Sequence, residues 1–315
     1  MADAFSLTGK KVWVAGHTGM AGSAIVRRLA TENCEILTVD RAKLDLQRQD
    51  DVEQWMTENR PDAVFLAAAT VGGILANTLR PADFLHDNLV ISTNVIHSAW
   101  KTGVKKLLNL GSSCIYPKLA TQPMTEDALL TGPLETTNQW YAIAKIAGIK
   151  LCQAYRQQHG CDFISAMPTN LFGDGDRYDL TQGHVVAALI MKIDAAKRES
   201  RDTVELWGTG TPMREFLYVD DLADGLVFLM KHYSDSDHIN VGTGKEMTIR
   251  ELAERIALVV GWKGTFTFDT RKPDGMPRKL MDISRLTAMG WTAKTPFNDG
   301  LAMAYSWYAA HRPTA

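Results

Sequence analysis

Short apolar runs alternate with amphipathic stretches along the first half of the chain. The runs are short enough to be buried strands, and they cover residues 11–15, 35–39, 63–67, 106–110 and 163–167. The stretches between them space their apolar residues as helices do, through Ile25 and Leu29, near 50–59, over about 81–102, and from the Tyr141 region to about 159. This alternation predicts an α/β fold with a doubly wound parallel sheet covered by helices on both faces.

The pattern changes beyond Pro168. Glycines and charged residues dominate residues 173–183, a helix is expected over about 184–197, and the later elements are shorter. Residues 214–221 are interpreted as a strand that rejoins the main sheet, and residues 286–307 as a C-terminal helical cap.

We therefore expect two parts. Residues 1–170 and 215–241 would form a dinucleotide-binding domain of the Rossmann type, and residues 171–214 and 242–315 a smaller, discontinuous substrate lobe.

A glycine-rich loop joins the first strand to the first helix. It reads Gly16-His17-Thr18-Gly19-Met20-Ala21-Gly22, and glycines at such a turn let the backbone approach a pyrophosphate at the helix N-terminus. Asp40 follows the second strand, close to the offset of about 20 residues at which an acidic residue binds the ribose of a dinucleotide. The loop alone would also fit a tight turn without a ligand, but its setting predicts a dinucleotide site.

Tyr141 and Lys145 lie four residues apart, so on a helix both side chains occupy one face. A phenol ionises near pH 10, and a neighbouring ammonium is expected to lower its pKa by roughly 1–3. Ser112 or Ser113, at the end of strand 106–110, could bind the same substrate oxygen. This set predicts proton transfer on a carbonyl oxygen while a hydride moves on carbon. The alternative is an aromatic core residue beside a solvated lysine.

Composition narrows the function class. The 315 residues carry a formal net charge of −2, which favours neither nucleic acid nor an anionic membrane as a partner. No apolar run approaches the ~20 residues that span a bilayer, and residues 1–4 do not begin a signal-peptide pattern. The 4 cysteines show neither metal-ligand nor disulfide spacing. We expect a cytoplasmic enzyme without a metal.

Several motifs together resemble the extended short-chain dehydrogenase/reductase family, whose members act on nucleotide sugars. They span nearly the whole chain, at residues 16–22, 71–74, 111–119, 141–148, 168–171, 207–216 and 272–279. The glycine loop and the tyrosine–lysine pair are general to the superfamily. The segment 112–118 and the presence of both Cys114 and His184 are more specific.

The resemblance implies a GDP-linked 4-keto-6-deoxy sugar as substrate, epimerised at carbons 3 and 5 and then reduced at carbon 4. Tyr141, Lys145 and Ser112 would act on the carbonyl oxygen. Cys114 and His184 would remove and return the carbon-bound protons, in an order that remains open. From the residues alone, Cys114 could instead be a packing residue and His184 a helix cap or surface group.

The resemblance also implies NADP(H) as cofactor and a homodimer built from the helices near 81–103 and 139–159. The expected cofactor contacts are Gly16, His17, Thr18, Gly19, Met20, Ala21, Gly22, Asp40, Arg41, Leu110, Gly111, Ser112, Ser113, Lys145, Pro168, Thr169, Asn170, Leu171 and His184. One departure matters, because Thr18 stands where the family often has an arginine. Asp40 would favour a free ribose hydroxyl and Arg41 a phosphate, so NAD(H) stays open beside NADP(H).

The substrate nucleotide would be bound by residues that the resemblance assigns: Lys192, Trp207, Arg214, Asp274 and Lys279. They could instead form a solvated basic face around a buried tryptophan. Alternative functions are another keto-sugar enzyme of this fold, such as a GDP-L-colitose synthase or a reductase without epimerase activity. A non-catalytic dinucleotide-sensing regulator is disfavoured, because Tyr141 and Lys145 are both present.

Overall fold

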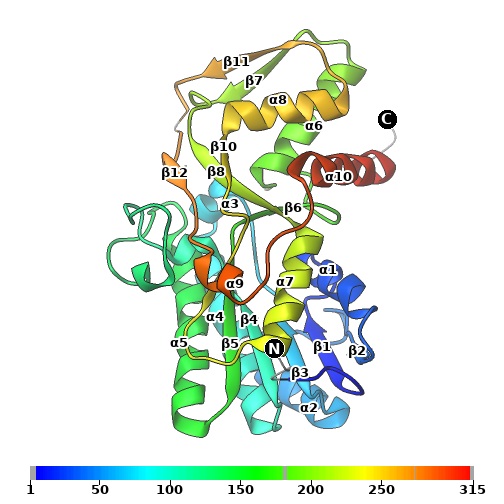
Figure 1. Ribbon diagram of the computed structural model, residues 1–315, viewed down its shortest axis with the longest axis vertical. Helices are drawn as coiled ribbons and strands as arrows, with labels where there is room; N and C mark the ends of the chain where they lie inside the picture. Colours follow the sequence, from blue (N-terminus) through cyan, green and yellow to red (C-terminus); the bar gives the residue numbers. More distant parts are fainter. Residues whose placement is uncertain (1–4, 180–182, 273, 313–315) are drawn as a thin grey trace.

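The computed structural model describes residues 5–179, 183–272 and 274–312. Residues 1–4, and Pro273 of the motif at 272–279, lie outside the described residues. Figure 1 shows a large sheet with its helices in the lower half and smaller sheets with further helices in the upper half. None of the described helices is long and apolar enough to cross a membrane.

The large sheet is parallel throughout, as predicted. Its strand order is β2-β1-β3-β4-β5-β9, with β1 (Lys11–Ala15), β2 (Glu35–Leu37), β3 (Ala63–Leu66), β4 (Lys106–Leu110), β5 (Asp162–Pro168) and β9 (Ile239–Val241). The chain leaves β1 to form β2 on one side and returns to form β3 on the other. Such a reversal opens a crevice at the carboxyl ends of β1 and β3, which is where ligands bind on sheets of this kind.

Helices cover both faces of this sheet (Figure 1). On one face lie α1 (Met20–Leu29) and α7 (Val219–His232), and on the other α2 (Gln49–Asn59), α4 (Pro81–Lys101) and α5 (Gln139–His159). Alternation along β1 divides its side chains between the two layers. Val12 and Val14 join the core under α1 and α7, whereas Trp13 and Ala15 join the core of the opposite face.

The strand expected to rejoin the main sheet does not do so. That strand, β8 (Met213–Tyr218), pairs instead with β6 (Asn170–Phe172), β10 (Glu246–Thr248) and β12 (Arg278–Lys279) in a separate sheet. The sixth strand of the large sheet is β9, just before residue 242. An apolar run predicts that a strand is buried, but its partners are set by distant segments, so the prediction was wrong about the partners.

A second core fills the upper half. It lies between α6 (Val185–Arg198), α8 (Ile249–Val260), α10 (Phe297–His311), and a ribbon of β7 (Thr203–Trp207) paired with β11 (Thr265–Asp269). Three short helices lie in the connecting segments: α3 (Ile74–Leu79), η1 (Ser113–Ile115) and η2 (Glu126–Ala128).

The predicted C-terminal helix is two helices. The first, α9 (Ser284–Ala288), ends shortly before Gly290, whose φ of 98° is unfavourable for other residues, and α10 begins after Pro296. Leu286 of α9 belongs to the core of the large sheet, whereas Leu301 of α10 belongs to the upper core. The break therefore lets the chain end cross from one part to the other.

Candidate active site

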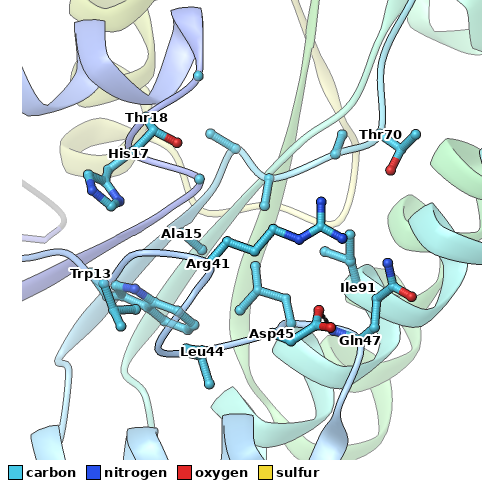
Figure 2. A pocket seen from close by; sticks show the side chains of 17 residues that line it. Trp13, Ala15, His17, Thr18, Arg41, Leu44, Asp45, Gln47, Thr70 and Ile91 are labelled. Atoms are coloured by element: carbon cyan, nitrogen blue, oxygen red, sulfur yellow. Dashed lines mark hydrogen bonds between the residues drawn. The ribbon is translucent and has the colours of Figure 1, made fainter.

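A pocket of about 220 Å³ opens at the predicted crevice, where β1 and β3 end (Figure 2). The glycine loop forms one wall and residues 67–70, which follow β3, form another. Its other lining residues come from β1, α4 and the segment after β2: Trp13, Ala15, Val39, Arg41, Leu44, Asp45, Leu46, Gln47 and Ile91. The pocket thus lies where a doubly wound sheet binds a dinucleotide.

The glycine loop can hold a pyrophosphate, and two of its glycines cannot be replaced without movement. A Cβ on Gly22 would lie 2.0 Å from the Gly16 carbonyl oxygen, and one on Gly16 (φ +90°) would lie 2.7 Å from the Ala68 backbone. These close approaches bring the N-terminus of α1 against the end of β1. The first turn of α1 contains no acidic residue, so its free N–H groups and partial positive charge are available to an anion.

The acidic and basic residues after β2 point to different places. Asp40 does not line the pocket; its Oδ1 lies 3.4 Å from Nε2 of His17, and its side chain is 65% exposed. Arg41 does line the pocket, and its side chain extends across it in Figure 2. The arrangement therefore fits a phosphate on the ribose, whereas the local sequence had favoured a free hydroxyl, as in NAD(H), or the use of both cofactors. Asp45 and Gln47, which the sequence analysis missed, also face this space.

Replacing Arg41 with alanine is expected to weaken NADPH binding about 10–100-fold, the value of a charge-assisted hydrogen bond to a phosphate. NADH carries no such phosphate, so its dissociation constant is expected to stay within about twofold. Titration of nicotinamide fluorescence measures both constants. Arg48→Ala is the matched control, because Arg48 is an exposed arginine of the same segment that pairs with Asp51 and does not line the pocket. An equal loss for both cofactors would contradict the assignment.

A second group of side chains gathers where β4 ends and α5 begins. Ser112 precedes η1, and its Oγ accepts the backbone N–H of Cys114 at 3.4 Å. Lys145 is buried, donates to the Leu110 carbonyl at 2.9 Å, and places its Nζ 5.7 Å from the centre of the Tyr141 ring. The helical spacing of the tyrosine and lysine therefore brings both to the strand end that carries the serine and the cysteine.

Desolvation dominates the proton affinities of this group. It raises the pKa of the Cys114 thiol, an effect opposed by Lys279, by the Ser112 hydroxyl and by Lys145. It lowers the pKa of Lys145 to about 8. It also raises the pKa of Tyr141, so the lowering expected from Lys145 was wrong.

Residues expected to hold the substrate approach this group from the upper half of the molecule. Lys279 of β12 influences the Cys114 thiol, and Arg214 pairs in register with Lys279 on β8. Desolvation lowers the pKa values of Lys279 and Arg214, so both cations lie in poorly hydrated positions that favour an anionic ligand. The strand pairing of β8 and β12 is what places them together.

Trp207 is the exposed aromatic residue of this region. It is 57% exposed rather than buried, and the Nζ atoms of Lys192 and Lys272 lie 5.5 Å and 5.3 Å from its ring centre. Asp274 accepts hydrogen bonds from the backbone N–H and the hydroxyl of Thr209, at 2.7 Å and 2.9 Å. An exposed aromatic ring with two cations beside it suits the base and the phosphates of a nucleotide. The sequence analysis did not assign Lys272 to the substrate site.

The remaining cofactor candidates lie at the same edge of the sheet. Gly111 is buried directly after β4, and Ser113 is the buried first residue of η1. The segment of Pro168, Thr169, Asn170 and Leu171 leads from β5 into β6. Thr169 Oγ1 and Asn170 Nδ2 both donate to the Glu215 carbonyl, at 3.2 Å and 2.7 Å. These bonds tie the end of β5 to β8.

His184, which the sequence analysis paired with Cys114, lies at the start of α6. It is the N-cap residue of α6, its side chain makes no capping bond, and 48% of that side chain is exposed. Its Nδ1 lies 3.8 Å from Oδ1 of Asp176. No hydrogen bond or ion pair within the described ranges joins His184 to Cys114.

Comparisons with known proteins agree with this arrangement. A family model described as the NAD dependent epimerase/dehydratase family matches residues 12–242. A GDP-L-fucose synthase from Sinorhizobium fredii is 58% identical over 307 residues, covering 98% of each chain. A GDP-L-colitose synthase from Yersinia pseudotuberculosis is 37% identical over 95% of this chain and 96% of its own. The solved structure of a GDP-L-fucose synthetase from Naegleria fowleri bound to NADP has a TM-score of 0.90 at 28% identity, covering 97% of this chain and 96% of that one.

Proposed function

The chain belongs to the NAD dependent epimerase/dehydratase family, and from that membership and its site we propose that it converts GDP-4-keto-6-deoxy-D-mannose to GDP-L-fucose, using NADPH. The observation that carries the proposal is the group formed by Ser112, Cys114, Tyr141 and Lys145, with Lys279 beside it. The fucose synthase of Sinorhizobium fredii is more similar to the chain than the colitose synthase is, at 58% against 37% identity.

Cys114 and His184 exchange the protons on carbons 3 and 5 of the sugar. The ketone at carbon 4 acidifies both protons, and inversion requires that one group removes a proton and another returns one from the opposite face. A thiol and an imidazole both titrate close enough to neutral pH for this work. Burial raises the pKa of the Cys114 thiol, while Lys279 and Lys145 favour its anion.

Tyr141 and Ser112 hold the oxygen at carbon 4 through both reactions. They donate hydrogen bonds to the enolate during epimerisation, and Tyr141 gives its proton to that oxygen when the ketone is reduced. Lys145, fixed by the Leu110 carbonyl, supports the phenolate that remains. Bound NADPH supplies the hydride, and Arg41 and the loop from Gly16 to Gly22 hold its phosphates.

The nucleotide of the substrate occupies the part made of residues 171–214 and 242–315, while residues 1–170 and 215–241 were assigned to the cofactor. Because β8 pairs and packs in the upper sheet, residues 215–218 belong with the substrate part, and residues 1–170 and 219–241 hold the cofactor. Arg214 and Lys279 neutralise the diphosphate, and Trp207 stacks on the base or sugar with Lys192 beside it. Asp274 accepts two hydrogen bonds from Thr209, and these bonds fix the segment that follows Trp207.

The enzyme is a cytoplasmic homodimer in this proposal. Helices α4 and α5 run side by side along one face of the sheet (Figure 1), and Trp140 and Ile143 on α5 are each 39% exposed. Pairing these helices across a two-fold axis would bury that apolar surface. Light scattering is expected to give twice the 34.8 kDa of one chain.

The function is tested by mixing the purified protein with GDP-4-keto-6-deoxymannose and either NADPH or NADH, and following the absorbance of the reduced nicotinamide. We expect turnover with both substrates present and faster turnover with NADPH. Binding of NADPH without turnover would overturn the proposal and direct the search to other 4-keto nucleotide sugars.

Replacing Cys114 with serine is expected to slow epimerisation roughly 10²–10⁴-fold, the usual contribution of one acid–base group. Reduction uses Tyr141, so the variant is expected to reduce the ketone without inverting carbons 3 and 5. The stereochemistry of the product by NMR separates the two steps. Cys34→Ser is the control, because Cys34 is a free, half-buried cysteine after α1. An inverted product formed at the normal rate would exclude Cys114 from proton transfer.

A further inference from the structure

We propose that Asp176 is the positioning residue for His184, holding the ring so that Nε2 faces the sugar. This inference rests on the proposed function, in which His184 exchanges a carbon-bound proton. The side chain of Asp176 is 3% exposed, whereas that of His184 is 48% exposed, and the two meet through Oδ1 and Nδ1 at 3.8 Å. A buried carboxylate thus lies beside one nitrogen of a ring whose remaining surface is open.

Backbone hydrogen bonds hold the loop that carries Asp176 close to the start of α6, where His184 lies. The Asp176 N–H donates to the Gly173 carbonyl at 3.2 Å, and Asp176 Oδ1 accepts the Arg177 N–H at 2.7 Å. The N–H of Gly183 donates to the Asp179 carbonyl at 2.8 Å. A Cβ on Gly183 would lie 2.6 Å or less from the carbonyls of Arg177 and Asp179, so only glycine lets the start of α6 come this close. The loop that carries Asp176 is therefore held against the residue preceding His184.

The same loop rests on the cofactor-binding helix. At Gly175, whose φ is +80°, the Cβ position lies 3.5 Å from Ser23 Oγ and 3.6 Å from Met20 Cα, both in α1. The backbone of the loop that carries Asp176 thus passes close to the helix that follows the glycine loop.

The chemical consequence is a fixed tautomer. The 3.8 Å between Nδ1 and Oδ1 is longer than a hydrogen bond, so in this proposal the ring closes that gap when the sugar binds; Nδ1–H then donates to the Asp176 carboxylate and Nε2 carries the lone pair. When Nε2 takes a proton from the sugar, the N–H bond forms, the C–H bond breaks and the electron pair moves to the carbonyl oxygen as an enolate. The carboxylate then stabilises the positive ring, and the reverse transfer returns the proton and restores the neutral ring.

A double-mutant cycle tests the assignment. The variants are Asp176→Asn, His184→Gln and their combination, and the assay is solvent deuterium entry into GDP-4-keto-6-deoxymannose without cofactor. Orienting partners of catalytic or ligating histidines contribute about 10–100-fold, so we expect that loss for Asp176→Asn alone. In the His184→Gln background the second substitution is expected to change nothing further. The substrate dissociation constant is expected to stay within about twofold, a split that a general structural defect would not produce.

Asp174→Asn is the matched control, since Asp174 lies in the same loop but its carboxyl is near Tyr218 and Arg27. Equal losses from Asp176→Asn in both backgrounds, or exchange at the wild-type rate, would overturn the role of Asp176. If His184→Gln itself exchanges at the wild-type rate, the proposed role of His184 fails instead. Should the Asn variant not fold, Asp176→Glu in both backgrounds gives the same comparison, with partial recovery expected only where His184 is present.

Discussion

Tyr141→Phe is expected to lower kcat for reduction roughly 10²–10⁴-fold, because the variant has no O–H to donate to the oxygen at carbon 4. Epimerisation is expected to slow as well, since the enolate at that oxygen loses the same donor. The affinity for NADPH is expected to be unchanged, because its phosphates are held at the ends of β1 and β2, away from Tyr141. Stopped-flow absorbance measures the reduction, and deuterium entry measures the enolisation.

Tyr155→Phe is the control on the same helix. Its hydroxyl pairs with His97 Nδ1 at 2.6 Å, away from Ser112 and Cys114, so kcat is expected to stay within about twofold. A Tyr141→Phe enzyme that retained a tenth or more of the wild-type kcat would exclude the phenol as the proton donor.

In the wild type, Lys145 carries its charge below its pKa of about 8 and loses it above. We therefore expect the reduction rate to fall above that pH.

Glu215→Ala is expected to lower the free energy of unfolding by roughly 3–5 kcal/mol, because several buried backbone donors lose their acceptor. The carboxylate is fully buried and accepts three backbone N–H groups, from Thr243 at 2.6 Å, Gly244 at 2.8 Å and Met281 at 3.1 Å. Removing it leaves three buried donors without a partner, and each such donor costs about 1–3 kcal/mol. Urea unfolding measures the loss.

Glu58→Ala provides the comparison, because Glu58 is exposed on α2 and its removal is expected to cost less than about 0.5 kcal/mol. Affinity for the GDP-sugar is also expected to fall in Glu215→Ala, since Glu215 links β8, which carries Arg214, to the segment that follows Lys279. A loss below about 1 kcal/mol would show that water satisfies the three donors.

The local parts of this fold and site were predictable from the sequence, and the parts set by long-range pairing were not. The strands at 11–15 and 106–110 and the glycine loop follow from apolar periodicity and turn chemistry within one segment. The pairing of β8 with β12 joins residues about 65 positions apart, and apolar pattern does not encode such a choice. The sequence around Glu215 shows only a single acidic residue in an apolar strand. Its structural role was not predictable, because its three N–H donors come from segments far along the chain.

The site shows the same division. Tyr141 and Lys145 are four residues apart, so helical geometry brings them together before any tertiary contact exists. Whether Asp40 or Arg41 faces the cofactor depends on the path of the chain after β2, where adjacent residues diverge. Asp176 was missed because its partner His184 lies across a loop, and a lone aspartate among glycines and charged residues gives no signal of its own.

The position of β9 determines the order in which the newly made chain can fold. Five strands of the large sheet are complete by residue 168, but the sixth does not exist until residue 241 has been synthesised. Until then β5 has an unpaired edge, the kind of edge that pairs with other chains and leads to aggregation. The donors that Glu215 needs arrive later still, the last of them at Met281. A chain that ended between the two halves would therefore lack β9, the last strand of the large sheet, and the Met281 N–H that binds Glu215.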